Sequence, residues 1–523
     1  MRLINTTTFE LEEYFGSNIP KYAILSHAWG NEEVSFQDWA NPTRRIAKAG
    51  YLKIDSACRQ ARRDGLDYLW VDTNCIDKSS SAELTEAINS MFTWYGNALI
   101  CYAYLEDVPG KSFENSRWFT RGWTLQELLA PSVVNFYDDG WTMLGTKENL
   151  ATKISNITGI DKKHLVQPRS VTYASVATRM NWISRRETTR EEDMAYCMLG
   201  IFDINMPLLY GEGRKAFMRL QEEIIRVSDD HTIFCWTWDK GIPGPHGTML
   251  SPSPLGFSNS AEYNFPRELR PHTPYSITNV GLSIRLPILK AWSYHLAILE
   301  AYQHGARSGI ALKGLLDVGR LQRMEDLESP VCLPGNVKAK DHDLIISSRG
   351  TRFGHYIPRQ PFCNVGVLVL FIGNVEMFHD CGSYPPDQFD QTRSIFQFND
   401  DQEISVGFLR LCSKSRRADD LIIFFGYIPA SKSKWLRRCN FLCHVMPSWL
   451  SNLNEGELAQ EFKYIKTHMA SGGYLPARFK LGVFTAVLTH SQIKPIRETR
   501  DSSTAIIDLT ANTSSPTEER ANY

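Results

Sequence analysis

Strand-like and helix-like patterns alternate along the first part of the chain, and this alternation limits the possible folds more than any other feature. Four short apolar runs have the length and composition of buried strands: 22–27, 68–72, 99–107 and 133–139. Apolar residues at three- and four-residue spacing predict three helices between them: 43–65, 80–98 and 123–129. Strands that alternate with helices in this way predict an α/β domain with an open parallel sheet and helices on its faces.

Several polar side chains follow the predicted strands at the edge where such sheets bind ligands. Ser26 and His27 end the first strand, and Trp29 comes directly after it. Asp72 ends the second strand, and the loop before Trp123 lies near the same edge. Because ligands of open α/β sheets bind beyond the carboxyl ends of the strands, we expect a site there.

The remainder of the chain divides into three parts. Residues 146–230 are mostly helical in pattern, and the clearest stripe consists of Phe217, Leu220, Ile224 and Val227. From "HTIFCWTW" (231–238) to residue 496, strand-like runs separated by Gly, Pro, Asn and Asp predict an all-β sandwich or barrel. Residues 497–523 are rich in Ser, Thr and Glu, which predicts disorder. We therefore expect an α/β domain at 1–145, a helical extension at 146–230, a β-rich domain at 231–496 and a disordered tail.

Composition narrows the classes of partner and compartment. The 57 Lys and Arg residues balance 58 Asp and Glu residues, so nothing in the net charge favours a nucleic-acid partner. The most apolar stretch, Val365–Gly373, is far shorter than the about 20 residues that span a bilayer. Eleven cysteines without paired spacing predict reduced thiols and a cytoplasmic protein. "CNFLCH" (439–444) has no second ligand pair at zinc spacing, so we expect no metal.

Local patterns around the candidate residues allow plain structural interpretations. Thr124 and Glu127 match the capping-box spacing, in which the glutamate only satisfies the start of its own helix. Cys75, with His27 and Asp72, has the residue types of a thiol-hydrolase triad, but no protease signature surrounds it. On residues alone, helix capping is the favoured role for Glu127, and core packing is the favoured role for Trp123.

Two further patterns have ordinary explanations. "GEGRKA" (211–216) matches a dinucleotide-binding spacing, but no strand pattern precedes it, so we predict a tight turn into a helix. The mixed charges at 185–192 predict a solvated helix face.

Four long, collinear motifs resemble the fungal heterokaryon-incompatibility (HET) domain family. They are "YAILSHAWG" (22–30), "LWVDTNCIDKSSSAELTEAINSMFTWY" (69–95), "SRWFTRGWTLQELLAP" (116–131) and "TTREEDMAYCMLGIFDINMPLLYGEGRKAFMRLQEEII" (188–225). Asn74 stands where the family more often has a second cysteine. The resemblance implies a role in programmed cell death after fungal non-self recognition, and it covers roughly the first 230 residues.

HET domains are in turn similar to Toll/interleukin-1 receptor (TIR) domains, in which some members cleave NAD. Trp123 and Glu127 match the W-x-x-x-E arrangement whose glutamate is catalytic in those enzymes. The resemblance therefore implies a TIR-like sheet, Glu127 as the catalytic carboxylate, and NAD as a substrate without any other cofactor. It further implies that Ser26, His27, Trp29, Asp72, Arg121 and Trp123 bind the substrate.

The resemblance leaves two functions open. In one, the domain hydrolyses NAD after self-association, and the β-rich region recognises a trigger or a partner. In the other, the domain is a non-catalytic interaction module that recruits partners, and Glu127 is only a helix cap. The two interpretations differ in where the Glu127 side chain should point.

Overall fold

The computed structural model divides into two compact units, which we describe separately. The first consists of Met1–Gly244 and Leu250–Asn264, and the second of Pro245–Met249 and Phe265–Tyr523. The structure describes residues 1–238 and 248–266 without interruption, and then the chain to residue 508 with gaps, the longest at 348–364, 429–439, 471–484 and 490–500.

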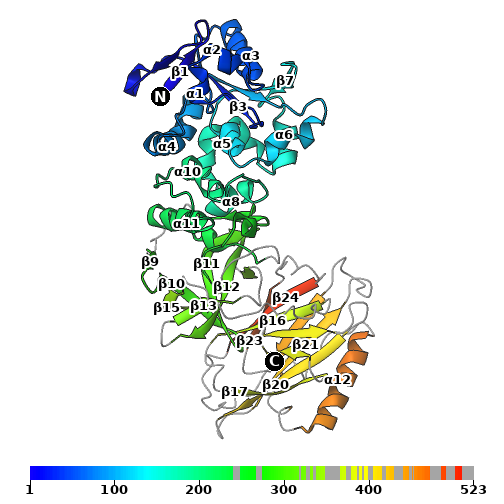
Figure 1. Cartoon of the computed structure of the whole chain (residues 1–523). Helices are drawn as coiled ribbons and strands as arrows, with labels where there is room; N and C mark the ends of the chain where they lie inside the picture. Colours follow the sequence, from blue (N-terminus) through cyan, green and yellow to red (C-terminus); the bar gives the residue numbers. More distant parts are fainter. Residues whose placement is uncertain are drawn as a thin grey trace. The chain divides into compact units, whose positions relative to one another are not determined.

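A seven-stranded sheet forms the centre of the first unit (Figure 1). Its strand order is β2-β1-β4-β3-β5-β6-β7. The strands are β1 (Arg2–Asn5), β2 (Leu11–Glu13), β3 (Ala23–His27), β4 (Tyr68–Trp70), β5 (Ile100–Tyr104), β6 (Val134–Tyr137) and β7 (Met143–Thr146). Strands β4, β3, β5 and β6 run parallel to one another, which confirms the α/β prediction. The short antiparallel edge strands β1, β2 and β7 were not predicted.

The helix predicted over 43–65 is two helices, α2 (Pro42–Ile46) and α3 (Tyr51–Arg63). The chain bends between them because the Gly50 N–H donates to the Glu32 carbonyl, 3.0 Å away, and a side chain at position 50 would meet that carbonyl. The predicted stripe of α3 is buried as expected: Ile54, Ala57, Cys58 and Ala61. Gly65 follows the helix with a positive φ of 74°, the conformation that suits glycine after a last turn.

Helix α4 (Ser81–Asn97) forms half of the predicted capping box. The Ser80 hydroxyl accepts a hydrogen bond from the Glu83 N–H, 3.4 Å away. The Glu83 carboxylate does not return to Ser80; it accepts from the Asp77 N–H and pairs with Arg2. The glutamate of a capping-box pattern is thus used here to join two distant segments.

Helices lie on both faces of the sheet. Because parallel crossovers are right-handed, α3, between β3 and β4, lies on one face, and α4, between β4 and β5, lies on the other. Helix α5 (Thr124–Leu129), between β5 and β6, shares the face of α4 and contacts it. Helices α4 and α5 therefore share one face of the sheet, and α3 lies on the opposite face.

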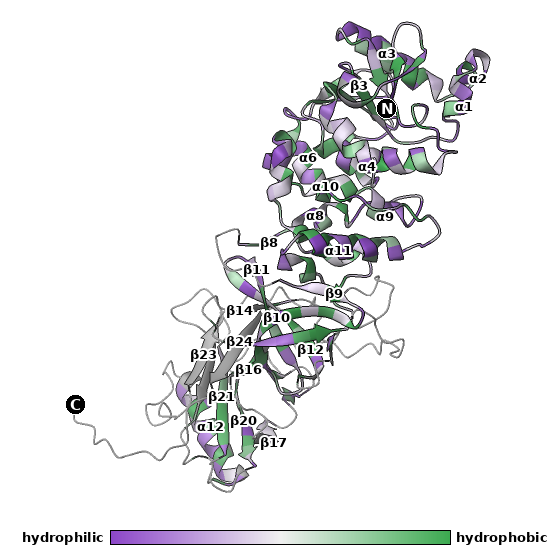
Figure 2. Cartoon of the chain, turned by 90° about the vertical axis from the view of Figure 1, so that its left-hand side faces the viewer, coloured by the Kyte–Doolittle hydropathy of each residue, from purple (hydrophilic) through white to green (hydrophobic). Residues whose placement is uncertain are grey.

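The helical part of the first unit agrees with its prediction in type. Its helices are α6 (Ala151–Thr158), α7 (Lys162–Val166), α8 (Val176–Ile183), α9 (Asp193–Tyr196), α10 (Leu199–Phe202) and α11 (Lys215–Val227). Hydrophobic and hydrophilic residues recur along α11, as in an amphipathic helix (Figure 2). Phe217, Leu220 and Ile224 are buried, whereas Val227, predicted in the same stripe, is 70% exposed at the end of the helix.

The stretch "HTIFCWTW" was predicted as the first strand of the β-rich region, and this prediction is wrong. His231–Phe234 forms a short 3-10 helix that begins at Asp230, whose carboxylate accepts from the Thr232 N–H at 2.8 Å. Ile233, Phe234 and Trp236 have no exposed surface. An apolar run that is buried on every side carries no periodicity from which strand and helix can be distinguished.

The second unit is mostly β. Strands β18, β19, β16, β10, β15, β13, β12 and β11 follow one another in a mainly antiparallel sheet, and β17, β20, β21 and β22 form a second sheet. Their bounds are β10 (Gly281–Lys290), β11 (His295–Gln303), β12 (Ala306–Leu315), β13 (Arg320–Arg323), β15 (Lys340–Ile346), β16 (Val365–Ile372), β17 (Phe378–Tyr384), β18 (Phe389–Asp390), β19 (Ile395–Phe398), β20 (Ser405–Ser413), β21 (Leu421–Ile428) and β22 (Asn440–Val445). The rings of Phe396 and Phe425 stack 4.5 Å apart and join the two sheets.

Three features of the second unit were not predicted. Helix α12 (Glu455–Ala470) packs Phe462 against Phe408 and Phe424. Cys412 is disulfide-bonded, so the prediction of reduced thiols throughout is wrong for this residue. Strand β24 (Asp501–Asp508) falls within the stretch predicted to be disordered, and residues 509–523 lie outside the described part.

Within the described ranges, none of the helices is long and apolar enough to cross a membrane.

Candidate functional site

The strand order creates one point where the connections of neighbouring parallel strands diverge. Strands β3 and β5 are adjacent; from β3 the chain passes to β4 on one side, and from β5 it passes to β6 on the other. Ligands of open α/β sheets bind outside the carboxyl ends of the strands at such a point. Ser26 and His27 are the last residues of β3, so the predicted edge and the diverging connections coincide.

Glu127 points away from its own helix start and toward β3. Its carboxylate accepts a hydrogen bond from the Ser26 hydroxyl, and that hydroxyl in turn accepts one from the Trp118 indole N–H, 2.8 Å away. No side chain caps α5, so the helix-cap role suggested by the sequence is wrong. The Thr124 hydroxyl, which a capping box would require as an acceptor, donates to the Trp118 and Arg121 carbonyls.

The Glu127 carboxyl group is buried and favours its neutral form. The residue is 7% exposed, and Ser26 has no exposed surface. Burial raises the pKa of Glu127 to about 8, and the negative charge of Asp72 acts in the same direction. The hydrogen bond from Ser26 and the charge of Arg121 act against burial. The side chain therefore carries a proton for most of the time at pH 7.

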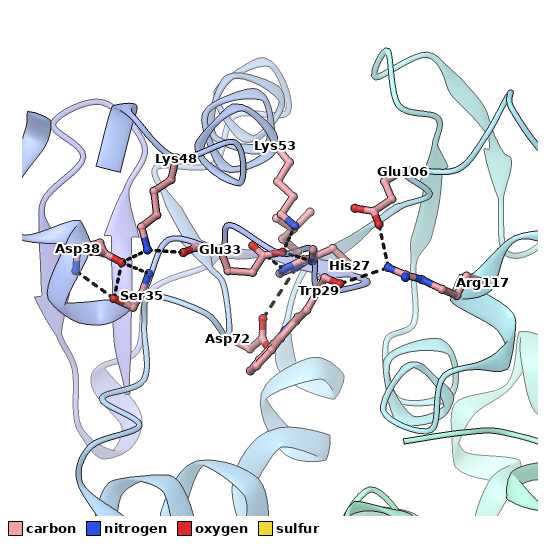
Figure 3. A network of polar contacts seen from close by, with 12 residues as sticks. His27, Trp29, Glu33, Ser35, Asp38, Lys48, Lys53, Asp72, Glu106 and Arg117 are labelled. Atoms are coloured by element: carbon pink, nitrogen blue, oxygen red, sulfur yellow. Dashed lines mark hydrogen bonds and ion pairs between the residues drawn. The ribbon is translucent and has the colours of Figure 1, made fainter. Parts of the chain in front are cut away.

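His27 belongs to a different polar network, because successive strand residues point to opposite faces of the sheet. Its imidazole lies between two carboxylates, 3.7 Å from Glu33 Oε2 and 3.9 Å from Asp72 Oδ1 (Figure 3). Lys53 of α3 pairs with Glu33, and the Gly30 N–H donates to the same carboxylate at 2.6 Å. Burial opposes the ionisation of Glu33, but its interactions with His27 and Lys53 outweigh burial and lower the pKa of Glu33 to about 2.

Trp29 stands at the exposed rim of this network. Its indole N–H donates to Asp72 Oδ2 at 2.8 Å, and the Lys78 ammonium lies 3.6 Å from the centre of its ring. Arg117 donates to the Trp29 carbonyl and pairs with Glu106, which follows β5. Trp29 is 41% exposed, so an aromatic surface flanked by cations faces solvent at the carboxyl edge of the sheet.

Among the described residues, neither Trp123 nor Arg121 forms a hydrogen bond or an ion pair with Glu127. The Trp123 indole N–H donates to Asp193 Oδ2 at 3.3 Å, which links α5 to α9. Arg121 is partly exposed, and its charge is near enough to act on Glu127. Ser26, Glu127, Asp72, His27 and Trp29 therefore gather at one edge, whereas Trp123 links α5 to α9.

The thiol-hydrolase arrangement does not form. Burial raises the pKa of the Cys75 thiol to about 12, and its sulfur accepts from the Val71 N–H at 3.4 Å. Neither ring nitrogen of His27 has a hydrogen-bond partner, so His27 cannot activate Cys75 in this structure.

"GEGRKA" is a turn, as predicted. Gly211 and Gly213 have positive φ angles of 104° and 58°. Their N–H groups donate to Glu192 Oε1 at 2.8 and 3.0 Å, so an internal carboxylate occupies the place of a phosphate.

Sequence reasoning missed Trp118, Glu33 and Arg186. Trp118 lies inside the HET-like motif at 116–131. A buried indole N–H usually has a hydrogen-bond partner, and this requirement could have indicated that Trp118 belongs to a polar network. The burial of Glu33 and Arg186 could not be predicted, because charged residues usually lie at the surface. Arg186 was expected on a solvated face, yet it is 6% exposed, and the segment around it is not helical.

A family description, "Heterokaryon incompatibility protein (HET)", matches residues 22–112, which contain β3, β4 and β5. The chain carries a HET domain. Over 221 residues it is 49% identical to the vegetative incompatibility protein HET-E-1 of Podospora anserina, an alignment that covers 39% of this chain and 16% of the relative. The chain thus spans about a sixth of the length of that protein. No solved structure matches.

Proposed function

We propose that this chain is a cytoplasmic effector of fungal non-self recognition whose HET domain hydrolyses NAD to nicotinamide and ADP-ribose. Glu127 is the carboxylate of the reaction. The observation that supports this assignment is the direction of Glu127: the side chain leaves its own helix and reaches Ser26 at the point where the strand connections diverge. The similarity to a vegetative incompatibility protein supports the biological role.

The reaction needs few groups from the protein. The nicotinamide–ribose C–N bond breaks, and its electron pair neutralises the positively charged nicotinamide ring. Positive charge develops on the ribose, and an ionised Glu127 beside it stabilises this charge. Water then adds to the ribose carbon and releases a proton. Because nicotinamide leaves as a neutral molecule, no second carboxylic acid is required.

The protonated Glu127 of the structure represents a resting state. A neutral carboxyl stabilises no cation, so the group must ionise before the C–N bond breaks. The positive charge of the nicotinamide ring favours that ionisation, because an opposite charge nearby lowers the pKa of a carboxyl group. Substrate binding thus prepares the carboxylate.

The burial of Glu127 makes access to it the step that activation controls. At 7% exposure the carboxyl group is almost closed to solvent. We assign the opening of the site to self-association of the HET domain, and the recognition of a trigger or partner protein to the β-rich unit. Ser26, His27, Trp29, Asp72, Arg121 and Trp123 bind or support the substrate, with Arg121 directed at its phosphates.

The test is nicotinamide release from NAD by purified protein over a range of protein concentrations. We expect release to rise more than linearly with protein concentration and to disappear in Glu127→Gln, which keeps the side-chain shape. Glu86→Gln, an exposed position on the neighbouring helix α4, is the matched control and should behave as wild type. Release that is absent at every concentration, or equal in Glu127→Gln, would reject the reaction and favour the non-catalytic interaction module.

A further inference from the structure

Arg186 is a buried cation at the base of the helix that carries Glu127. It follows α8 in the sequence and is 6% exposed, whereas its neighbour Arg185 is exposed. Lysine and arginine are rarely buried unless a carboxylate pairs with them. Arg186 forms no ion pair within the described part of the chain, and its Nη2 atom is buried without a hydrogen-bond partner. A guanidinium held in this way calls for an explanation beyond packing.

The guanidinium is bonded to the first turn of α5. Its Nη1 donates to the Arg121 carbonyl at 2.9 Å and to the Thr124 hydroxyl at 3.0 Å. Thr124 donates to the Trp118 carbonyl, and the Trp118 indole donates to Ser26, the partner of Glu127. Arg186 therefore contacts the helix that bears the carboxyl group, and Thr124 links it to Trp118, which holds the hydroxyl partner.

The backbone fixes Arg186 against the same turn. The Gly122 N–H donates to the Glu187 carbonyl at 2.8 Å, and the Glu187 N–H donates to the Thr120 carbonyl at 2.7 Å. These bonds form an isolated parallel bridge between residues 121 and 187. Because the next residue, Glu187, makes both of these backbone bonds, the place of Arg186 relative to α5 does not depend on a flexible side chain alone.

The charges of Arg186 and Glu127 interact. Burial lowers the pKa of the guanidinium to about 10, and Cys197 and Glu127 act in the opposite direction. The other titratable or charged groups that act on Glu127, or on which Glu127 acts, are Asp72 after β4, Tyr95 of α4, Cys101 of β5, Arg121 before α5 and Cys197 after α9. Of these, only Arg121 is a second cation, and it is partly exposed.

We propose that Arg186 is a positioning residue for Glu127: it holds the first turn of α5 so that the carboxyl group faces Ser26, and its buried charge favours the ionised carboxylate. The relevance of this positioning to NAD hydrolysis rests on the proposed function. The physical coupling between Arg186 and Glu127, however, can be measured without NAD.

The experiment follows the titration of Glu127 in the full chain by thermal unfolding between pH 5 and pH 10. The difference in unfolding temperature between each protein and its Glu127→Gln counterpart reports the ionisation of Glu127. In Arg186→Gln we expect the folded-state pKa of Glu127 to rise by about one unit, the lower end of the shift that a nearby opposite charge produces. The midpoint of the difference curve lies halfway between the unfolded and folded pKa values, so it should rise by about half a pH unit. Arg185→Gln, the exposed neighbour, should leave the midpoint unchanged.

Arg186→Lys keeps the experiment decisive if Arg186→Gln does not fold. The shorter ammonium stands farther from the first turn, so the midpoint should rise by a fraction of a unit. An unchanged midpoint in the variants that fold overturns the proposal. Nicotinamide release is recorded in parallel. A shifted midpoint without release supports the coupling and rejects the proposed reaction. Release with an unchanged midpoint supports the proposed reaction and rejects the coupling.

Discussion

At the scale of single residues, the protonation of Glu127 dominates the properties of the site. The carboxyl group accepts a hydrogen bond from Ser26, whose hydroxyl accepts one from Trp118, and the negative charge of Asp72 opposes the ionisation of Glu127. A buried acid that is neutral at pH 7 lowers the reactivity of the resting domain. The same burial strengthens the interaction of the carboxylate with a developing cation once it ionises, because the local dielectric is low.

Nicotinamide release should therefore depend on pH in one direction. If the ionised form of Glu127 is required, kcat/KM follows the ionised fraction of the free protein and rises about tenfold between pH 6 and pH 7. It should level off above about pH 8, the pKa of Glu127. Measuring kcat/KM from pH 5.5 to pH 9.5 checks this expectation. A profile that falls across this interval would mean that Glu127 acts as an acid.

The difference in stability between Glu127→Gln and wild type should also depend on pH, for the same reason. Between pH 4.5 and about pH 8 the unfolded chain has lost the Glu127 proton while the folded chain retains it, so wild type becomes less stable as pH rises. Glutamine is neutral at every pH and avoids this loss. We expect the variant to exceed wild type by on the order of a few kcal/mol at pH 8 and to match it near pH 4.

Chemical denaturation of both proteins at pH 4, 6 and 8 measures this difference. A variant that is less stable than wild type at pH 8 would show that Glu127 is ionised and paired in the folded domain, contrary to the burial described above. Glu86→Gln again supplies the reference for an exposed glutamate, with no change at any pH.

At the scale of elements, the first turn of α5 is held by a segment 65 residues later in the chain. Gly122 lies so close to that segment that a Cβ atom would stand 2.5 Å from Thr188 Cγ2 and 3.3 Å from Cys197 Sγ. This close approach explains why residue 122 is glycine. Trp123 is explained by the hydrogen bond that its indole N–H donates to Asp193. Glu127 follows one turn later because that spacing directs it to Ser26.

Gly122→Ala should destabilise the first unit by about 1–3 kcal/mol, the usual cost of inserting a methyl group into a packed region. Adding Thr188→Ser should recover part of the loss, because serine keeps the hydroxyl that donates to the Arg190 carbonyl and removes the clashing methyl group. Denaturant unfolding measures both effects.

Gly96→Ala is the matched control for this substitution. The glycine lies in α4, where a Cβ atom would meet only the Ala130 carbonyl at 3.7 Å. Alanine there should be neutral or stabilising by up to about 1 kcal/mol. Equal losses at positions 96 and 122 would contradict the close packing of α5 against the segment around Thr188.

The elements that the sequence predicted well are those whose pattern is set by burial on the sheet. The four parallel strands are mostly apolar, and Ile54, Ala57, Cys58 and Ala61 form a complete helical stripe, so local pattern and tertiary position agree. The edge strands β1 and β2 have mixed burial, and no local pattern distinguishes them from loop.

The side-chain environments of the site were less predictable. The spacing of Thr124 and Glu127 satisfies the capping-box pattern, and only the tertiary fold decides that Thr124 donates to carbonyls while Glu127 reaches β3. Likewise Arg186, in a run of mixed charge, is buried by contacts with Arg121 and Thr124 that no local pattern specifies.

At the scale of the whole molecule, the two units have different architectures and, in our proposal, different tasks. The first contains the parallel sheet and the Glu127 site, and the second contains two mainly antiparallel sheets with α12. The matched family region lies within the first unit. In this proposal the first unit performs the chemistry and the second receives the signal.

The most direct test of this proposal is the NAD concentration in fungal cells after induced expression of the chain. We expect NAD to fall before viability is lost in cells that express wild type, and to remain constant, with survival, in cells that express Glu127→Gln at equal abundance. Death of both cultures with NAD intact would contradict the central role of Glu127 and show that the HET domain kills by recruiting partners.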